Sequence, residues 1–194
     1  MSRYPPHPLT KPEAQALIRV ASDGTETGVR NRAICTVLYR TGVRCHELCA
    51  MQIDDLYPLD DDRMMIRIRL PKGYENGVMP REIGLDQKSA GIINEWMEVR
   101  GQGGSPLFIT RSGAGVLPSY IRQMLPRLGL RAGIKRRVHP HAFRHTFCKE
   151  LYEEGVGVME IMLAMGHHSL TTTQKYLRHI GATEVVNATM RRSW

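Results

Sequence analysis

The spacing of apolar residues changes between residues 53 and 85, and this change constrains the fold more than any other feature. Residues 64–70 read MMIRIRL, an alternation typical of a strand with one buried face. Segments 53–57 and 78–85 also have β-compatible composition, and residues 72–77 contain an Asn-Gly pair that favours a hairpin loop. We therefore expect a small antiparallel sheet.

The remainder of the chain has helical spacing. The hydroxyl of Thr10, with Glu13 three residues later, predicts the start of a first helix, which Gly24 and Gly28 are expected to break. A second helix should end near Gly42, where glycine allows a sharp turn. Further helices are expected at about 44–51, 86–100, 118–131, 140–154, 157–166, 169–178 and 182–192, with a short strand over 107–110.

These elements predict a mainly α fold with a small antiparallel β-sheet (α+β). We expect one domain over residues 10–194, preceded by a disordered extension of residues 1–9. The chain contains no apolar run of about 18 residues, so no membrane span is expected. Four cysteines without a CxxC pair, and a polar start without a secretory signal, favour a cytoplasmic protein.

The charge of the chain favours a polyanionic partner. Its 27 lysines and arginines outnumber its 19 acidic residues, for a formal net charge of +8. Such an excess favours nucleic acid, because each phosphate contact releases counterions.

Three polar segments carry the candidate chemistry: TGVRCHEL at 41–48, HAFRHTF at 141–147 and GHHSLTTTQKY at 166–176. In the first, Arg44 and Glu47 are one helical turn apart, so the carboxylate can hold the guanidinium. In the second, His141 and Arg144 share a helix face.

Together, these segments resemble the tyrosine recombinase family, which includes phage integrases, Xer recombinases and fimbrial inversion enzymes. The resemblance covers about residues 10–180 and implies the recombinase catalytic-domain fold. It also implies a catalytic set, with Glu47 in support: Arg44, Lys72, His141, Arg144, His167 and Tyr176. Lys72 falls where the family has a lysine, in the turn between the second and third strands, although Pro71 replaces a glycine often found there.

The chemistry of phosphodiester cleavage fits these residue types. Arg44 and Arg144 can clamp the nonbridging oxygens, since a guanidinium binds phosphate bidentately, and His167 can donate to the same oxygens. His141 is placed to exchange the proton of the tyrosine, and Lys72 can protonate the leaving 5′-oxygen. The resemblance implies a covalent 3′-phosphotyrosine intermediate on Tyr176, with neither metal nor cofactor.

Two other functions stay open from the residues alone. A DNA-binding regulator on the same fold would bind without cutting. A metal-dependent hydrolase could use the histidines, but no glutamate lies between His141 and His145 and the Cys45–Cys49 stretch has no second ligand pair, so no metal is expected.

The resemblance also implies partners. The expected partners are double-stranded DNA with specific recombination sites and, in a homotetrameric synapse, three further copies of the chain. When it is not in a synapse, the chain is expected to be a monomer. Residues 182–192 are expected to pack either on their own core or on a neighbouring copy. Larger family members usually have an N-terminal DNA-clamping domain, so either this chain is a piece of a longer protein or it resembles the single-domain fimbrial invertases. With only residues 1–9 before the first helix, we expect a weaker grip on DNA and help from accessory DNA-binding proteins.

Overall fold

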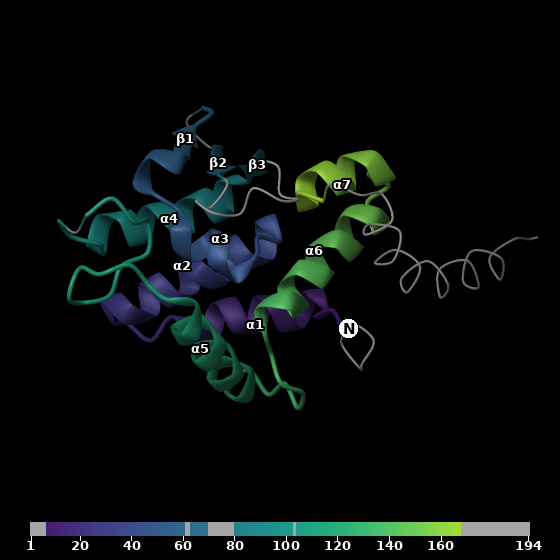
Figure 1. Cartoon of the computed structure of the whole chain (residues 1–194). Coiled ribbons are helices and arrows are strands. Elements are labelled where there is room, and N and C mark those ends of the chain that lie inside the picture. Colours follow the sequence, from purple (N-terminus) through teal and green to yellow (C-terminus); the bar gives the residue numbers. More distant parts are fainter. Residues whose placement is uncertain (1–6, 61–62, 70–79, 103, 168–194) are drawn as a thin grey trace, which may run out of the picture.

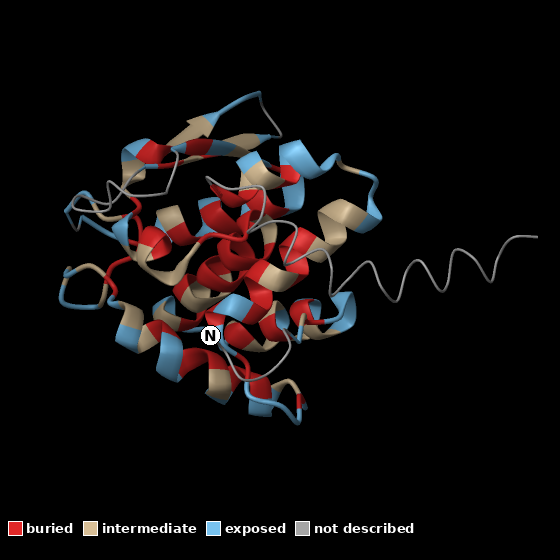
Figure 2. Ribbon diagram, turned by 45° about the vertical axis from the view of Figure 1, so that its right-hand side comes forward, coloured by how far each residue is buried: buried red, intermediate tan, exposed pale blue. Residues whose placement is uncertain are grey.

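Helix α2 (Glu26–Thr41) is the centre of the fold. It packs against α1 (Lys11–Ala21), α4 (Gln87–Val99) and α6 (Pro140–Glu153). Because neighbours cover it on several sides, its buried residues are not confined to one stripe. Figure 2 shows buried residues gathered in the centre of the molecule. The C-terminal end of α2 leads directly into the first of the three polar segments.

The computed structural model describes residues 7–60, 63–69, 80–102 and 104–167 (Figure 1). The other elements are α3 (Cys45–Ala50), the 3-10 helix η1 (Ile53–Asp55), β1 (Leu56–Pro58), β2 (Met64–Ile68), β3 (Arg81–Leu85), α5 (Pro118–Arg131) and α7 (Val158–Met165). The sheet lies on one side of the molecule, at the top of Figure 1, and α1 and α5 lie on the opposite side. The expected fold class, mainly helical with a small antiparallel sheet, is confirmed.

The sheet is antiparallel in the order β1-β2-β3. Its central strand buries Ile66 and Ile68, while Arg67 between them pairs with Glu82 on the exposed face. The alternation in the sequence therefore gave the correct face. The first β segment was placed too early, because residues 53–55 form η1 before the strand begins.

Two helix ends follow the expected chemistry. Thr10 and Glu13 form a reciprocal capping box at the start of α1. Gly42 ends α2 in the left-handed conformation, with φ of 58°. The expectation that Gly28 breaks the first helix was wrong: this residue lies in the first turn of α2, and Thr25 accepts its N–H. A Cβ at Gly28 would lie 2.1 Å from the Asp23 carboxylate, so the position needs glycine for close approach.

Disorder through residue 9 was also a wrong expectation. Leu9 is buried, and its backbone N–H donates to the Thr146 hydroxyl at 2.7 Å. The single proton of the same hydroxyl can be donated to the carbonyl of Leu9, at 3.3 Å, or to that of Ala142, at 2.9 Å. The N-terminal segment is thus held against α6.

Three further expectations concern the rest of the chain. Instead of a strand over 107–110, there are isolated bridges, between Ile109 and Gly115 and between Gln52 and Pro106. The helices expected at 169–178 and 182–192 lie outside the described residues. Among the helices that are described, none is both long and apolar enough to cross a membrane.

Candidate active site

Arg44 lies at the N-cap of α3, directly after the turn that Gly42 makes. Its backbone N–H donates to one oxygen of Glu47 at 2.6 Å, and its guanidinium donates to the other at 3.0 Å. A further long hydrogen bond reaches the carbonyl of Gly166 at 3.5 Å. Glu47 therefore holds Arg44 through both backbone and side chain, as the i,i+3 spacing predicted.

A second arginine, which was not among the predicted site residues, binds the same carboxylate. Arg81 on β3 donates to both oxygens of Glu47, at 3.1 and 2.9 Å, and its Nε donates to the carbonyl of Ala164 at 2.7 Å. Both side chains of this pair are nearly inaccessible, at 5% and 0% exposure. A signal for it was present in the alternation of β3. Arg81 lies two residues before Ile83 and four before Leu85, so it shares the inward face of the strand with them.

Electrostatics keep Glu47 ionised. Burial by itself raises the pKa of this carboxyl, but the hydrogen bonds and charge of Arg81, together with those of Arg44, lower it to about 2. The paired carboxylate stays negative at neutral pH and can orient both guanidiniums.

Arg144 on α6 joins the ends of two other helices. It is 2% exposed, and its Nη1 donates to the carbonyl of Gly42 at 2.7 Å. Its Nη2 donates to the carbonyl of Met165, at the end of α7. A residue on one helix thus fixes the turn that presents Arg44 and the turn that presents His167.

His167 follows Gly166, the left-handed C-cap of α7. Its Nε2 lies 3.0 Å from Nη2 of Arg144. Because a guanidinium only donates, Nε2 accepts here, so the neutral ring carries its proton on Nδ1. Burial, with the charges of Arg144 and Arg44, lowers the pKa of His167 to about 3. The ring is neutral at physiological pH and can donate through Nδ1 alone.

His141 lies one helical turn before Arg144, near the start of α6. That start is formed by Pro140 and by His139, whose ring nitrogen Nδ1 accepts the backbone N–H of Ala142 at 3.2 Å. Burial lowers the pKa of His141, with the charges of His139 and Arg144 adding to the effect. A neutral imidazole at this position can accept a proton.

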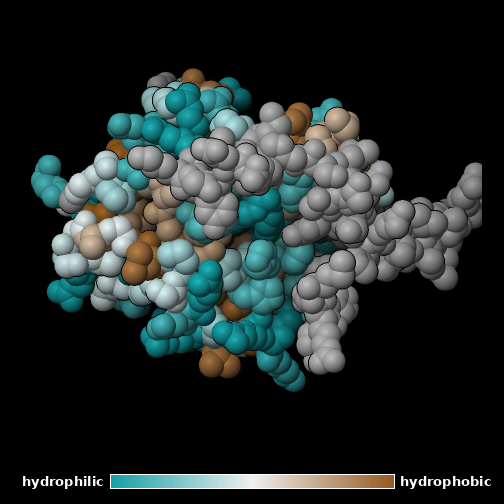
Figure 3. Space-filling view, viewed as in Figure 1, coloured by the Kyte–Doolittle hydropathy of each residue, from teal (hydrophilic) through white to brown (hydrophobic). Residues whose placement is uncertain are grey.

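These elements surround a cavity of about 590 Å³. The described residues that line it are Val43, Arg44, Cys45, His46, Arg122, Arg137, His139, Pro140, His141 and Arg144. Four are arginines and three are histidines, and this lining includes no carboxylate. Such a cavity is suited to bind a phosphate, because the guanidiniums supply permanent charge in fork geometry. Figure 3 shows hydrophilic residues around the centre and along much of the lower edge of one face, with more apolar residues at the left.

The structure brings four of the six predicted catalytic residues together. Arg44, His141 and Arg144 line the cavity, and His167 contacts Arg144 behind it. Lys72 and Tyr176 lie outside the described residues. For the metal hypothesis, no group of three or more potential ligands occurs within the part of the chain that the structure describes.

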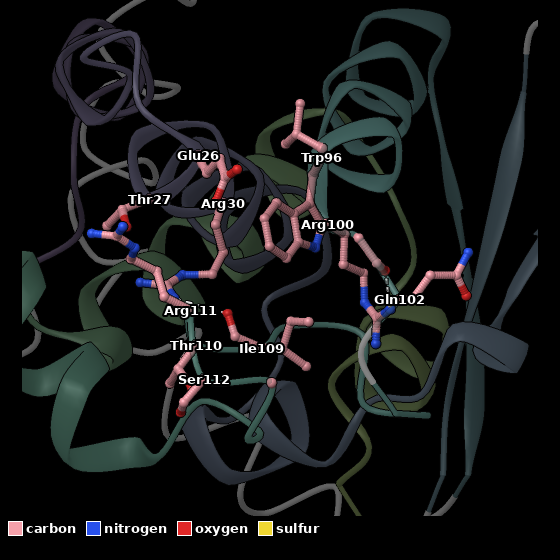
Figure 4. A pocket seen from close by; sticks show the side chains of 13 residues that line it. Glu26, Thr27, Arg30, Trp96, Arg100, Gln102, Ile109, Thr110, Arg111 and Ser112 are labelled. Carbon is pink, nitrogen blue, oxygen red and sulfur yellow. Dashed lines mark hydrogen bonds between the residues drawn. The ribbon is translucent and has the colours of Figure 1, made fainter.

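Another arginine-lined pocket lies at the other end of α2. Figure 4 shows Arg30 and Arg111 on one side of it and Arg100 on the other, beyond Trp96. Arg30 donates to the carbonyl of Ile109 at 2.8 Å, and Arg100 donates to the carbonyl of Leu107 at 3.2 Å. Both guanidiniums tie the segment 104–110 to helices, so we assign them a structural role.

Comparisons with known proteins identify what this arrangement resembles. The profile of the phage integrase family matches residues 7–182. Tyrosine recombinase XerC of Xylella fastidiosa (strain M23) is 32% identical over 172 residues, which cover 88% of this chain and 55% of that protein. The chain thus spans little more than half the length of this curated relative.

Solved structures give the same result. The crystal structure of XerA recombinase superposes with a TM-score of 0.82 at 29% identity, covering all of this chain and 68% of that one. XerH recombinase, in a post-cleavage complex with its difH substrate, superposes with a TM-score of 0.79 at 23% identity, covering 95% of this chain and 53% of that chain. This second likeness concerns the fold.

Proposed function

Since the chain belongs to the phage integrase family, we propose that it cuts and rejoins DNA at specific sites as a tyrosine recombinase. In this proposal residues 10–194 are the catalytic domain. Tyr176 attacks the scissile phosphate and holds the 3′ end covalently while the 5′-oxygen leaves. The new phosphodiester forms when a 5′-hydroxyl attacks that phosphotyrosine, so no nucleotide is consumed.

A single observation carries the proposal: the described residues that line the cavity include four arginines and no carboxylate. Arg44 and Arg144 approach it from different helices, and each is fixed by partners behind it. Preorganised guanidiniums stabilise the charge that develops on a phosphorane-like transition state without reorganising during the reaction.

The histidines and the lysine have distinct roles in this scheme. His141, held neutral by its surroundings, takes the proton of Tyr176 as general base. His167 donates from Nδ1 to a nonbridging oxygen while its Nε2 stays on Arg144. Lys72 protonates the departing 5′-oxygen. Arg81 and Glu47 touch no DNA and position Arg44.

The partners in this proposal are those that the family resemblance implies. The DNA is double-stranded, and XerH, which shares the fold, is solved with its difH substrate. Four copies assemble on two sites in the synapse, from chains that are monomeric when free, with accessory DNA-binding proteins contributing to site choice. The compartment is the cytoplasm.

A suicide DNA substrate tests the proposal. We expect a covalent protein–DNA adduct that forms in the presence of EDTA and disappears in Tyr176→Phe. Tyr152→Phe, a tyrosine on α6 outside the cavity lining, is the matched control and should keep the adduct. Binding without any adduct would favour the non-cutting regulator, and metal-dependent cleavage without an adduct would favour the hydrolase.

A further inference from the structure

Cys45, in the wall of the cationic cavity, and Cys49, which the described lining does not include, form a pair of thiols. They are one helical turn apart on α3, and Cys45 directly follows Arg44. Cys45 lines the cavity, and its thiol donates a weak hydrogen bond to the carbonyl of Pro118 at the start of α5, at 3.8 Å. The proposed recombination chemistry gives neither thiol a role.

The four free cysteines differ in reactivity. Cys35 and Cys148 are fully buried, and burial raises the pKa of their thiols to about 12 and about 11. Both therefore remain protonated and inaccessible. Cys45 and Cys49 are partly exposed, so a reagent can reach this pair.

Within the pair, Cys45 is the nucleophile, because the described lining of the cavity includes its side chain and not that of Cys49. A hydrogen bond from Cys49, aided by the charge of Arg122, lowers the pKa of the Cys45 thiol, although burial opposes the shift. The same hydrogen bond raises the pKa of Cys49. Thiolate therefore forms first on the sulfur that faces the cavity, and thiolate is the reactive species.

We propose that Cys45 is a modification site, at which an acidic low-molecular-weight disulfide forms a mixed disulfide that closes the cavity. The Cys45 thiolate attacks one sulfur of the disulfide, a new S–S bond forms, and the old S–S bond breaks. The leaving thiolate takes the electron pair and a proton from water. The sulfur of Cys45 is oxidised, and the leaving sulfur is reduced.

The geometry of α3 favours a mixed disulfide over a bond between the two cysteines. Residues four apart on a helix have Cβ atoms about 5–6 Å apart. A disulfide requires about 3.5–4.5 Å. Joining Cys45 to Cys49 would distort the helix that carries Glu47, so Cys49 acts as the hydrogen-bond donor and not as the resolving thiol.

Charge selects the class of reagent. Arg122 and Arg137 attract an anionic disulfide to the cavity, where its carboxylates can pair with guanidiniums. The attached acidic group then occupies the space beside Arg44 and Arg144. Loss of DNA cleavage on modification rests on the proposed function, whereas the modification itself does not.

Mass spectrometry of the whole chain and of its peptides tests the modification. With oxidised glutathione as the probe, we expect one glutathionyl group on Cys45, added on the order of ten times faster than on Cys35 or Cys148. Cystamine, a cationic disulfide, should react several-fold more slowly. Cys49→Ala should slow the reaction several-fold, and Cys49→Ser, which keeps a donor, should restore most of the rate. Equal labelling of all four cysteines, no labelling, or a Cys45–Cys49 disulfide would overturn the proposal.

A DNA cleavage assay tests the consequence. Each variant is compared with and without oxidised glutathione, so its own untreated activity is the reference. We expect the chain to lose cleavage on treatment and recover it with dithiothreitol, and Cys45→Ser to be insensitive. If fully modified protein still cleaves DNA, the claim that the mixed disulfide closes the cavity is wrong. Labelled Cys45 in a chain that never cleaves DNA, even untreated, counts against the recombinase function and leaves the thiol assignment standing.

Discussion

Arg81 and Glu47 form a buried, bidentate ion pair, with N–O distances of 3.1 and 2.9 Å. The same carboxylate accepts two hydrogen bonds from Arg44, at 2.6 and 3.0 Å. One acidic side chain thus connects the sheet to the turn that presents a proposed catalytic arginine. The Glu47 carboxylate therefore lies just behind the cavity that the guanidiniums line, and is not part of that lining.

Breaking this pair should affect stability and cleavage together. Glu47→Ala leaves the buried guanidinium of Arg81 and the partly buried guanidinium of Arg44 without their counterion, and we expect it to lower the free energy of unfolding by about 3–5 kcal/mol. The double variant Glu47→Leu/Arg81→Met removes both charges, so it should recover much of that loss. DNA cleavage by the double variant should stay low, because Arg44 no longer has the carboxylate that positions it. Urea unfolding and suicide-substrate cleavage measure the two effects. Recovery of cleavage in the double variant would contradict the positioning role.

Acid should destabilise the fold in two overlapping windows. The folded-state pKa of His167, about 3, lies below its ordinary 6.5, so the unfolded chain binds a proton that the folded chain excludes. The free energy of unfolding should therefore fall as pH drops from 6.5 toward 3, by up to about 1.4 kcal/mol per pH unit for this proton. Glu47, at about 2 against 4.5, adds a loss below pH 4.5.

Urea unfolding across this pH range measures the slope, and His167→Gln should flatten it between pH 6.5 and 4.5. His145, with a pKa that burial lowers to about 4, contributes to the same window and should leave a residual slope. An unchanged slope in His167→Gln would show that His167 is not held neutral.

The exposed arginines of the cavity should contribute to DNA affinity through phosphate contacts. Arg137→Ala should weaken binding to all DNA sequences similarly. It should also reduce the slope of log affinity against log salt by about one, as expected for one lost contact. Fluorescence anisotropy at several salt concentrations measures both. Arg19→Ala, an exposed arginine on α1 outside the cavity, is the charge-matched control. A sequence-dependent loss in Arg137→Ala would indicate base contact instead.

Gly42→Ala should destabilise the fold by about 2–4 kcal/mol, as the sum of backbone strain and overpacking. The residue has φ of 58°, and an added Cβ would lie 2.4 Å from the ring of Phe147. Gly133→Ala is a matched control, because φ there is 74° but the added atom meets nothing within 4 Å. Thermal or urea unfolding of both variants separates the cost of backbone strain, which the two share, from the cost of overpacking against Phe147, which only Gly42→Ala has. Equal losses of stability in the two variants would mean that the Phe147 ring moves easily to accommodate the added Cβ. Because the carbonyl of Gly42 accepts from Arg144, cleavage should fall in Gly42→Ala alone.

The sequence by itself determined the local features. The helical class, the capping box at Thr10, the turn at Gly42 and the alternation of β2 each depend on residues within a few positions of one another. The link between Arg44 and Glu47 is of the same kind, because one helical turn separates them. Such features are encoded by propensity and spacing, which a linear reading can detect. The motif order, in turn, was enough to indicate the family.

Tertiary structure alone decided how the site is held. Arg81 lies 34 positions from Glu47, and no spacing rule connects a strand arginine to a carboxylate on a helix. The bond from Arg144 to Gly42 spans 102 positions, and it exists because α6 packs on α2. The neutral state of His167 likewise depends on burial and on charges from distant elements. Contacts of this kind arise from packing, which brings distant residues together only once the chain has folded.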